Sequence, residues 1–488
     1  MTKGATATAQ QQSANGSRGA AAPAPPPPKS AGASADADTW LEGISHEGLR
    51  RVLEGVAQRD HDQPEFLEAV HEVASSVQPV LERRPELVDA FAMMCEPERQ
   101  IIFRVPWLDD SGAWRVNRGF RVQFSSAIGP YKGGLRFREG VNLSICKFLG
   151  FEQMYKNALT TLPLGAAKGG SDFDPRGASD SEVQRFCQSF MTELYRHIGN
   201  RMDVPAGDIG VGTKEIGYLF GQYRRITGRH DASLTGKRLD FGGSEVRPEA
   251  TGFGVVFFAD CMLADAGEEL KGKRCIVSGS GNVAQYCAMK LLDRGAKVLA
   301  MSDSRGYVYE PEGLTKEQLE QIMSIKASHK GRLEQYKSDS GQYVGDRRKP
   351  YEIDTQIDCA FPCATQNEID VDEARHLTDH GCKYVIEGAN MPCTAEAVRH
   401  FEEQGVAFGP AKAANAGGVA VSGLEMAQDR VGIMWTREEV CKKLVEIMHS
   451  IHRSAKAAAE EYGTTLAAGA NIAAFLKVAE AVQAQGAV

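Results

Sequence analysis

The sequence lacks two features that would assign it to large classes of proteins. It contains no run of five or more basic residues and its formal net charge is -8, so the electrostatic footprint of a nucleic-acid-binding protein is missing. It also contains no apolar stretch of 18 residues, the length that a membrane-spanning helix needs. We therefore expect no nucleic-acid partner and no transmembrane helix.

The eleven cysteines lack the spacing of a metal site. The closest pairs, Cys359 with Cys363 and Cys382 with Cys393, do not form the paired CxxC motifs that bind zinc. Scattered thiols are typical of reduced, mostly buried cysteines in a cytosolic protein. The prediction is a cytoplasmic protein with no metal cofactor.

Residues 1–38 have little that could be buried, because they consist mainly of Ala, Ser, Gly, Gln and Pro. This composition predicts a disordered tail. The segment is poor in acidic residues and carries Lys3, Arg18 and Lys29, which leaves import into an organelle as the weaker alternative. It lacks the amphipathic, arginine-rich pattern of a transit peptide.

The remaining chain is long enough for two domains, since 42% of its 488 residues are apolar. The first, assigned to residues 39–236, mixes strand and helix patterns. Strands are expected at Gln100–Leu108 and Gly119–Ala127, the latter half-buried because apolar and polar residues alternate. Apolar residues recur on one helical face between Val183 and His197. The pattern indicates an α/β domain with its own sheet.

The second domain, assigned to residues 237–424, contains a βαβ pattern. A buried strand at Cys275–Ser278 is followed by a GxGxxA turn, a helix at 282–294 and a strand at Lys297–Met301. Gly279 makes the turn, Gly281 lets a pyrophosphate approach the backbone, and Ala284 permits close helix packing. Because strand, helix and second strand all fall where the motif requires, we favour a Rossmann-type dinucleotide-binding domain over a simple packing turn.

Five segments place polar residues in glycine-rich or helical surroundings. LPLGAAKGGSDFDP contains Lys168, GPYKGGLRF contains Lys132, and DVPAGDIGVG contains Asp208. FEQMYKNALTTLP places Gln153 and Lys156 on one side of a helix, and Ser422 follows a third glycine-rich turn in NAGGVAVSGLEMAQ. Taken singly, each has an ordinary explanation: the lysines as solvated charges, Asp208 as a turn former and Ser422 as a helix cap. Together they suit a small dianion, since two cations can hold two carboxylates, a third can polarise a carbonyl and the aspartate can move protons.

These segments, together with RPEATGFG, CATQNE and EGANMP, resemble the glutamate dehydrogenase family, specifically its small hexameric type, from about Leu49 to the C-terminus. The resemblance implies two domains around a cleft, with residues 425–488 forming helices that pack back on the first domain. It also implies a homohexamer and reversible reductive amination, in which 2-oxoglutarate, ammonium and reduced nucleotide give glutamate. Cleft closure would protect the imine from water before hydride transfer.

The resemblance also implies roles for the substrate-binding residues. Lys132, helped by Ser422, would bind the side-chain carboxylate of glutamate. Lys156, with Gln153 nearby, would bind the main-chain carboxylate.

Two further residues would carry the chemistry. Lys168 would polarise the 2-oxo group and assist the carbinolamine and imine steps, and Asp208 would exchange protons with ammonia and the intermediate. Contacts with the nicotinamide cofactor are implied for Thr251, Asn282 and Asn390.

The end of the second strand bears on the choice of nucleotide. Asp303 lies about twenty residues past the glycine turn, where an acidic residue favours the free ribose hydroxyl of NAD. Ser302, Ser304 and Arg305 surround it, and hydroxyls with a guanidinium suit a 2'-phosphate. We favour NADP, with NAD as the alternative.

Three other functions are weighed against this interpretation. An apolar amino acid dehydrogenase is disfavoured because Lys132 would face a hydrophobic side chain unpaired. A regulatory protein that binds nucleotide without catalysis is disfavoured by the presence of Lys168 and Asp208. A zinc-dependent alcohol dehydrogenase would need clustered Cys and His ligands.

Overall fold

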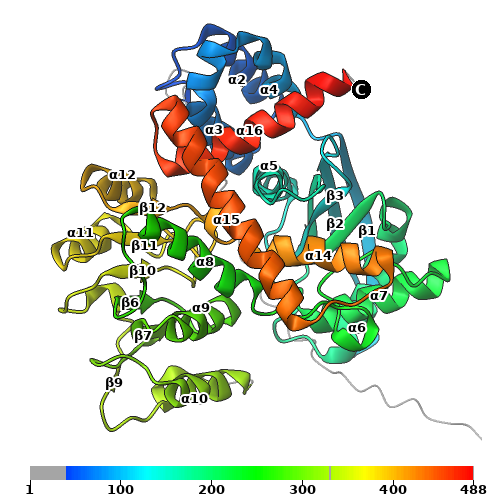
Figure 1. The fold of residues 1–488 in the computed structure, drawn as a ribbon. Coiled ribbons are helices and arrows are strands. Elements are labelled where there is room, and N and C mark those ends of the chain that lie inside the picture. Colours follow the sequence, from blue (N-terminus) through cyan, green and yellow to red (C-terminus); the bar gives the residue numbers. More distant parts are fainter. Residues whose placement is uncertain (1–39, 329–330, 487–488) are drawn as a thin grey trace, which may run out of the picture. The chain divides into compact units, whose positions relative to one another are not determined.

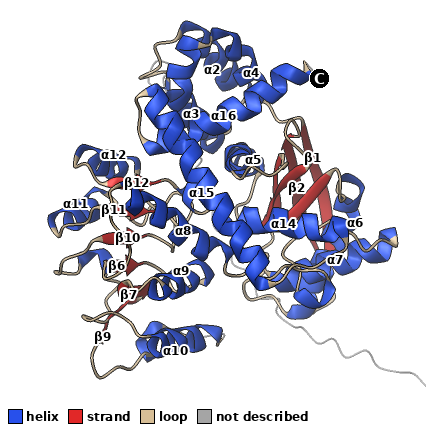
Figure 2. Ribbon diagram, viewed as in Figure 1, coloured by secondary structure: helices blue, strands red, loops and turns tan. Residues whose placement is uncertain are grey.

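The computed structural model describes residues 40–328 and 331–486, so the predicted tail at residues 1–38 lies outside the described residues. The described chain contains two separate sheets with helices packed on them, which confirms the predicted α/β fold class (Figure 1). Figure 2 shows that helix predominates over strand. The predicted domain boundaries at 236/237 and 424/425 stay predictions.

The first described elements are helices: α2 (Glu47–Arg59), α3 (Pro64–Arg83), η1 (Pro85–Leu87) and α4 (Val88–Met94). The apolar face of α3 is completely buried. Its Phe66 makes aromatic contacts with Phe124 and Phe151, and α3 also packs against the C-terminal helix α16 (Leu466–Gln485). The N- and C-terminal parts of the described chain therefore share one core.

The five-stranded sheet consists of β1 (Arg99–Leu108), β2 (Trp114–Ser125), β3 (Tyr131–Phe137), β4 (Ala166–Ser171) and β5 (Asp203–Gly207), in the order β1-β2-β4-β3-β5. Strands β3, β4 and β5 are parallel, whereas β2 runs antiparallel to both β1 and β4. Helix α5 (Leu143–Leu159) packs on β2 and β4. Helices α6 (Asp180–Leu194) and α7 (Thr213–Thr227) share an aromatic-rich core with β1 and β3, and η2 (Tyr195–His197) follows α6.

The prediction of a half-buried strand at Gly119–Ala127 is wrong in one respect. The second half of β2 is buried on both faces, although polar residues alternate with apolar ones there. The Arg121 guanidinium, fully buried, pairs with the carboxylate of Asp203 at the start of β5, and the Gln123 amide donates to the same carboxylate at 3.0 Å. Buried polar groups are tolerated when they are paired in this way.

The seven-stranded sheet has the order β12-β11-β10-β6-β7-β8-β9. Its strands are β6 (Arg274–Val277), β7 (Lys297–Asp303), β8 (Gly306–Tyr309), β9 (Gln342–Val344), β10 (Cys359–Phe361), β11 (Tyr384–Ile386) and β12 (Ala407–Gly409). The strands from β12 to β7 are parallel, and β8 and β9 add an antiparallel edge. The predicted βαβ unit is confirmed, with α9 (Asn282–Asp293) between β6 and β7.

Further helices accompany this sheet. They are α8 (Ala250–Asp265), α10 (Lys316–Ala327), η4 (Leu333–Gln335), η5 (Pro350–Glu352), α11 (Val371–Asp379) and α12 (Ala395–Glu403). The short helix η3 (Leu239–Phe241) instead packs against the core of the five-stranded sheet, where Phe241 stacks on Phe220 of α7. Parallel strands joined by crossover helices are the architecture that the glycine-turn motif requires.

The chain ends in α13 (Ala411–Ala414), α14 (Gly417–Val431), α15 (Arg437–Tyr462) and α16. A capping box of Thr436 and Glu439 begins α15, and α16 packs on α3, α4 and α5. Among residues 40–328 and 331–486, no single helix has the length and apolar character to cross a membrane; α15 and α16 pass that test only as a pair bent by 100°.

The glycine-rich turn predicted before Ser422 is wrong, because Gly417 and Gly418 already belong to α14. Their lack of side chains permits close helix packing instead. A Cβ at Gly417 would lie 2.2 Å from the Ala250 carbonyl oxygen, and one at Gly418 would lie 2.5 Å from Thr251 Oγ1. Helix α14 therefore lies directly against α8.

Candidate active site

Lys168 lies within β4 and is buried, so the alternative that this lysine is a solvated charge is wrong. Its ammonium forms an ion pair with Asp208, with 2.8 Å between Nζ and Oδ2, and Arg136 lies 3.3 Å from the same oxygen. Burial alone would raise the pKa of Asp208, but the charges of Lys168 and Arg136 outweigh it and hold the pKa below its usual range. The two predicted catalytic residues are therefore in contact, with Asp208 ionised.

Lys132 is a buried cation with one polar partner. Its side chain is at β3, 1% exposed, and its ammonium donates to Thr235 Oγ1 at 2.7 Å. Among the described residues no carboxylate forms an ion pair with it. Burial, reinforced by the like charge of Arg247, lowers the pKa of Lys132 well below its ordinary value. An anion placed beside this ammonium would relieve an unfavourable charge.

Two more cations lie near this group without acidic partners. Burial, followed by the charge of Lys168, lowers the pKa of Lys156 to about 8, and burial also lowers the pKa of Arg247. The Arg247 Nε–H is buried and donates to no acceptor in the described chain. Because Arg247 acts electrostatically on both Lys132 and Lys156, the three side chains form one positive cluster.

Gln153 and Asn157 hold α5 in place against β3. The Gln153 amide donates to Asn157 Oδ1 at 2.7 Å, and the Asn157 amide donates to the carbonyl oxygens of Lys132 at 3.0 Å and Gly165 at 2.5 Å. Through these bonds, the helix that carries Lys156 is fixed relative to the strand that carries Lys132. Gln153 therefore has a positioning contact in addition to its predicted role.

Ser422 lies inside α14 and is buried. It shares a helical face with Val419 and Met426, which pack against Leu164 and Val204. Val204 lies directly opposite Lys132 in the pairing of β3 with β5. The fold therefore brings Ser422 to the part of the five-stranded sheet that carries Lys132.

The register of the strands orders the polar groups along the sheet. Leu135 pairs with both Gly169 and Gly207, so Lys168 lies level with Gly134 and Asp208 lies level with Arg136. Lys132 is two residues before Gly134, and therefore about 7 Å along the strand from the level of Lys168. The Lys168–Asp208 pair and the Lys132 ammonium therefore occupy neighbouring positions along one stretch of β3.

The glycine turn after β6 has the geometry that a dinucleotide requires. Gly279 has φ +83°, and its N–H donates to Ser302 Oγ at 2.8 Å. A Cβ added at Gly281 would meet no atom within 4 Å, so the approach to the start of α9 is open for a phosphate. Ser302 thus supports the turn as a hydrogen-bond acceptor.

Three predicted cofactor contacts lie around this turn. The Asn282 amide, at the start of α9, donates to the Pro248 carbonyl oxygen at 2.5 Å, next to the segment that carries Arg247 and Thr251. Asn390 follows β11, and its Oδ1 accepts from the Asn415 amide at 2.9 Å. The segment from Arg247 to Thr251 therefore connects the positive cluster with the start of α9.

At the end of β7, the Asp303 carboxylate is occupied by backbone groups. It accepts from the N–H of Arg305 at 2.9 Å and from the N–H of Leu333 at 3.0 Å. The Arg305 guanidinium is largely exposed, 3.4 Å from Glu334, and Arg332 donates to Ser304 at 3.4 Å. Two guanidinium groups consequently surround this strand end.

Sequence reasoning missed Arg247, Arg136 and Thr235. Arg247 opens the segment RPEATGFG, from which only Thr251 was selected, and Arg136 stands in GPYKGGLRF with Lys132. Strand alternation offered a signal for Arg136, because it shares a strand face with Gly134, where a Cβ would lie 2.9 Å from Asp208 Cβ. Nothing in the sequence places Thr235, since 103 residues separate it from Lys132.

A parallel sheet with an open glycine turn, beside a second sheet with a lysine–aspartate pair and buried cations, defines the class of dinucleotide-dependent dehydrogenases. Two family models agree. Residues 242–486 match the model described as Glutamate/Leucine/Phenylalanine/Valine dehydrogenase, and residues 97–225 match the Glu/Leu/Phe/Val dehydrogenase, dimerisation domain. The chain belongs to the Glutamate/Leucine/Phenylalanine/Valine dehydrogenase family.

Individual relatives cover most of the chain. It is 63% identical to an NADP-specific glutamate dehydrogenase of Chlorella sorokiniana over 449 residues, covering 92% of this chain and 86% of the relative. It is 51% identical to an NAD-specific glutamate dehydrogenase of Clostridium symbiosum, and the match covers 89% of this chain and 98% of the relative. The crystal structure of Plasmodium falciparum glutamate dehydrogenase superposes with a TM-score of 0.89 at 51% identity. The superposition covers 90% of this chain and 95% of that structure's chain.

Proposed function

We propose that this chain catalyses the reversible reductive amination of 2-oxoglutarate by ammonia, with NADPH as reductant, to give L-glutamate. One observation carries the proposal: Lys132, Lys156 and Arg247 are cations without acidic partners in the described chain, and they lie beside the Lys168–Asp208 ion pair. Such a cluster suits a substrate with two carboxylates and a reacting carbonyl. The names of the relatives support the same reaction.

The buried cations assign the two ends of the substrate. We infer that Lys132, with Ser422 and Arg247, binds the side-chain carboxylate, and that Lys156, on the helix ordered by Gln153, binds the main-chain carboxylate. An apolar amino acid would leave Lys132 buried and unpaired, which costs several kcal/mol per ion. This cost favours a dicarboxylate over leucine-, valine- or phenylalanine-type substrates.

Lys168 and Asp208 then divide the proton transfers. The Lys168 ammonium polarises the 2-oxo group for attack by ammonia and donates the proton with which the carbinolamine oxygen leaves as water. Asp208, held ionised by Lys168 and Arg136, accepts the proton that the attacking nitrogen loses. The nicotinamide, when bound, supplies the hydride. Exclusion of water at that stage protects the imine from hydrolysis.

The residues around the glycine turn fit a dinucleotide, with the pyrophosphate at Gly281 and the start of α9. We propose NADP as the preferred form, with NAD as the alternative. Support comes from Asp303, whose carboxylate already accepts two backbone N–H groups and is less available to a ribose hydroxyl. Arg305, beside it, has a largely exposed guanidinium that suits a 2'-phosphate.

We further propose assembly into a homohexamer. The match to a dimerisation-domain model covers β1 and β2, and these strands expose large apolar side chains, with Trp114 at 74%, Val116 at 65% and Ile102 at 51%. β1 is also an edge strand. Exposed apolar residues on an unpaired edge are typical of an interface between subunits.

The test is a set of initial rates of reduced-nucleotide oxidation with 2-oxoglutarate and ammonium, comparing NADPH with NADH and using 2-oxoisocaproate as control substrate. Fast turnover of 2-oxoglutarate with NADPH is expected, and Lys168→Ala should abolish it while leaving NADPH binding nearly intact. Faster turnover with NADH would overturn the cofactor proposal. Binding of both nucleotides without oxidation of either would favour a regulatory protein.

A further inference from the structure

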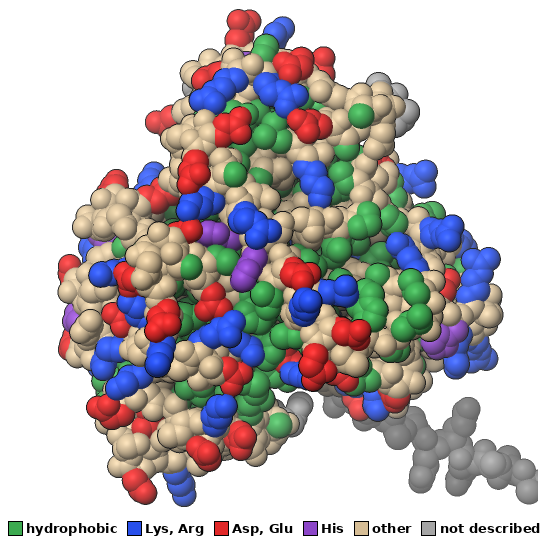
Figure 3. All heavy atoms as spheres, viewed as in Figure 1, with side chains coloured by type: hydrophobic (Ala, Val, Ile, Leu, Met, Phe, Trp, Pro, Cys, Tyr) green, Lys and Arg blue, Asp and Glu red, His purple; other side chains and the backbone are tan. Residues whose placement is uncertain are grey.

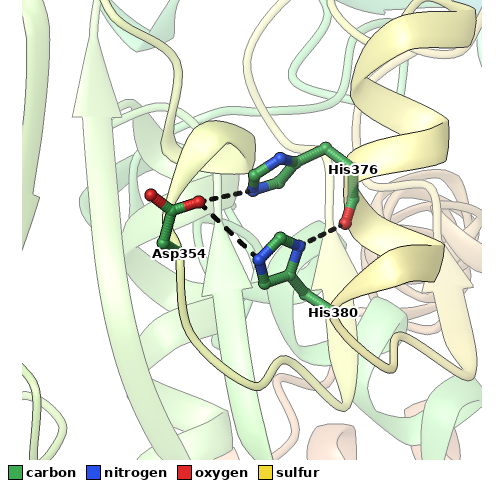
Figure 4. A group of neighbouring side chains, drawn as sticks. All are labelled: Asp354, His376 and His380. Atoms are coloured by element: carbon green, nitrogen blue, oxygen red, sulfur yellow. Dashed lines mark hydrogen bonds and ion pairs between the residues drawn. The ribbon is translucent and has the colours of Figure 1, made fainter.

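One group of three metal-ligating side chains in the described chain lies outside the candidate active site. It consists of Asp354, His376 and His380, each of which offers a ligand atom within 4.8 Å of the others (Figure 4). Asp354 follows η5, whereas the histidines come from the end of α11. The fold therefore brings Asp354 next to two histidines that follow it by more than twenty residues in the sequence.

The two histidines lie one helical turn apart on the same face of α11. Their rings stack with centroids 4.0 Å apart, and Asp354 Oδ1 lies 3.9 Å from His376 Nε2 and 3.7 Å from His380 Nε2. In tetrahedral coordination with the usual zinc–ligand lengths, two donor atoms are roughly 3.3 Å apart. Because the Asp354 side chain is 90% exposed, it is free to approach by the remaining half ångström.

The hydrogen bonds orient one ring for metal binding. His380 Nδ1 lies 2.8 Å from the His376 carbonyl oxygen, and since a carbonyl only accepts, Nδ1 must carry the proton. The Nε2 lone pair of His380 is then directed toward Asp354. A backbone carbonyl that fixes the tautomer in this way is the usual partner of a metal-bound histidine.

The other ring has a carbonyl partner at its Nε2. The Ile353 carbonyl oxygen is 3.3 Å from His376 Nε2, so this nitrogen donates to it in the metal-free protein, and metal binding requires the tautomer in which the proton has moved to Nδ1. Two imidazole nitrogens with a carboxylate oxygen suit borderline divalent cations such as Zn²⁺, Ni²⁺ and Co²⁺, whereas Mg²⁺ and Ca²⁺ prefer all-oxygen sites.

We propose that Asp354, His376 and His380 bind one divalent transition-metal cation of the Zn²⁺ class. The bound cation ties the segment after η5 to the end of α11, where the Ile357 N–H already donates to the His380 carbonyl at 3.0 Å. Asp354 precedes β10 and His380 precedes β11, whereas the glycine turn follows β6. Because these strands are parallel, the metal site lies at their N-terminal ends and the glycine turn lies at the C-terminal ends. Its role is to stabilise this segment and not to take part in catalysis.

The experiment uses untagged, chelator-treated full-length protein and measures Zn²⁺ binding by titration calorimetry, with Co²⁺ absorption as the probe of coordination. We expect a Zn²⁺ site that is lost in His376→Gln/His380→Gln and weakened at least about tenfold in Asp354→Asn, with Mg²⁺ not binding there. Zn²⁺ should also raise the Tm of the parent but not of the double variant.

His400→Gln is the matched control, because His400 lies on the neighbouring helix α12, contacts Thr378 of α11 at 3.1 Å and belongs to no ligand group. It should bind Zn²⁺ as the parent does. Circular dichroism of the apo variants verifies folding. Unchanged Zn²⁺ affinity in the folded double variant, absence of Zn²⁺ binding by the parent, or a Co²⁺ spectrum without nitrogen ligation would overturn the proposal.

Discussion

Replacing Lys132 with methionine should separate substrate binding from stability. Its ammonium is buried, has Thr235 as its hydrogen-bond partner and forms no ion pair among the described residues. Methionine has a similar length and can fill the same space without the charge. Lys132→Met should therefore fold at least as well as the parent and yet lose its activity on 2-oxoglutarate.

The expected change in stability follows from two opposing contributions. Loss of the ammonium leaves the Thr235 hydroxyl without its donor, which costs about 1–3 kcal/mol. Removal of a buried, uncompensated charge returns several kcal/mol. The free energy of unfolding should therefore stay the same or increase.

The expected change in catalysis is much larger. Removing one partner of a buried charge pair costs about 2–5 kcal/mol, and each 1.4 kcal/mol is a factor of ten. The kcat/KM for 2-oxoglutarate should fall by roughly 30-fold to several thousand-fold. The kcat/KM for 2-oxoisocaproate should not fall, since its apolar side chain gains nothing from Lys132.

Lys237→Met is the matched control. The Lys237 ammonium is equally buried, but it forms ion pairs with Glu425 at 2.9 Å and Asp429 at 2.7 Å. Its removal leaves carboxylates buried and unpaired, which typically costs about 3–5 kcal/mol. Denaturant unfolding and initial rates on both variants decide the matter. The proposed role of Lys132 is refuted if Lys132→Met destabilises the protein as much as Lys237→Met does, or if Lys132→Met still turns over 2-oxoglutarate.

The pH dependence of stability provides an independent check. The pKa of Lys132 is lower in the folded than in the unfolded chain, so between the two values the unfolded chain binds the additional proton. This group therefore lowers stability below its folded pKa, and stability rises as pH increases through that pKa. The alkaline gain in stability should be smaller in Lys132→Met than in the parent.

Three other predictions concern the ligands and the assembly. Because the pKa of Lys156 is about 8 in the free protein, the KM for 2-oxoglutarate should rise up to tenfold per pH unit above that value. Arginine stays charged over this pH range, so Lys156→Arg should abolish the rise. Initial rates measured as a function of pH check both statements. Arg305→Ala should raise the KM for NADPH about tenfold or more while leaving that for NADH unchanged, and equal effects on both nucleotides would contradict a contact with the 2'-phosphate. Trp114→Glu should reduce the assembled mass measured by light scattering, because a charge would replace an exposed indole in the proposed interface; an unchanged mass would remove Trp114 from that interface.

Local features were predictable because their signals lie within a few residues. The βαβ unit around Gly279 and Gly281 was predicted almost residue for residue, and Thr436 and Glu439 at the start of α15 have the spacing that a capping box requires. In both cases the backbone requirement and the residue that meets it are neighbours in the chain. The burial of both faces in the second half of β2 was not predicted, because its polar residues are buried through contacts with Asp203, some eighty residues away.

The partners of the candidate catalytic residues were outside the reach of the sequence. Lys168 and Asp208 are 40 residues apart, and only the parallel pairing of β3 with β4 and β5 brings them to 2.8 Å. Arg247 approaches Lys132 from a different part of the chain altogether. Family resemblance supplied the roles of the lysines, whereas the absence of carboxylate partners became visible only in the folded protein.

The glycines around Lys168 have a structural reason that the sequence did not reveal. Glycine and alanine in such a run can leave room for a ligand, but in β4 they leave room for neighbouring strands. A Cβ at Gly169 would lie 2.4 Å from the Phe120 carbonyl oxygen, and one at Gly170 would lie 2.0 Å from that of Arg136. The strand therefore has to be nearly free of side chains where it passes its neighbours, and Lys168 is the one long side chain that it carries. Because β4 is paired on both sides, the Lys168 ammonium extends from a rigid backbone, as its proposed role in polarising one carbonyl requires.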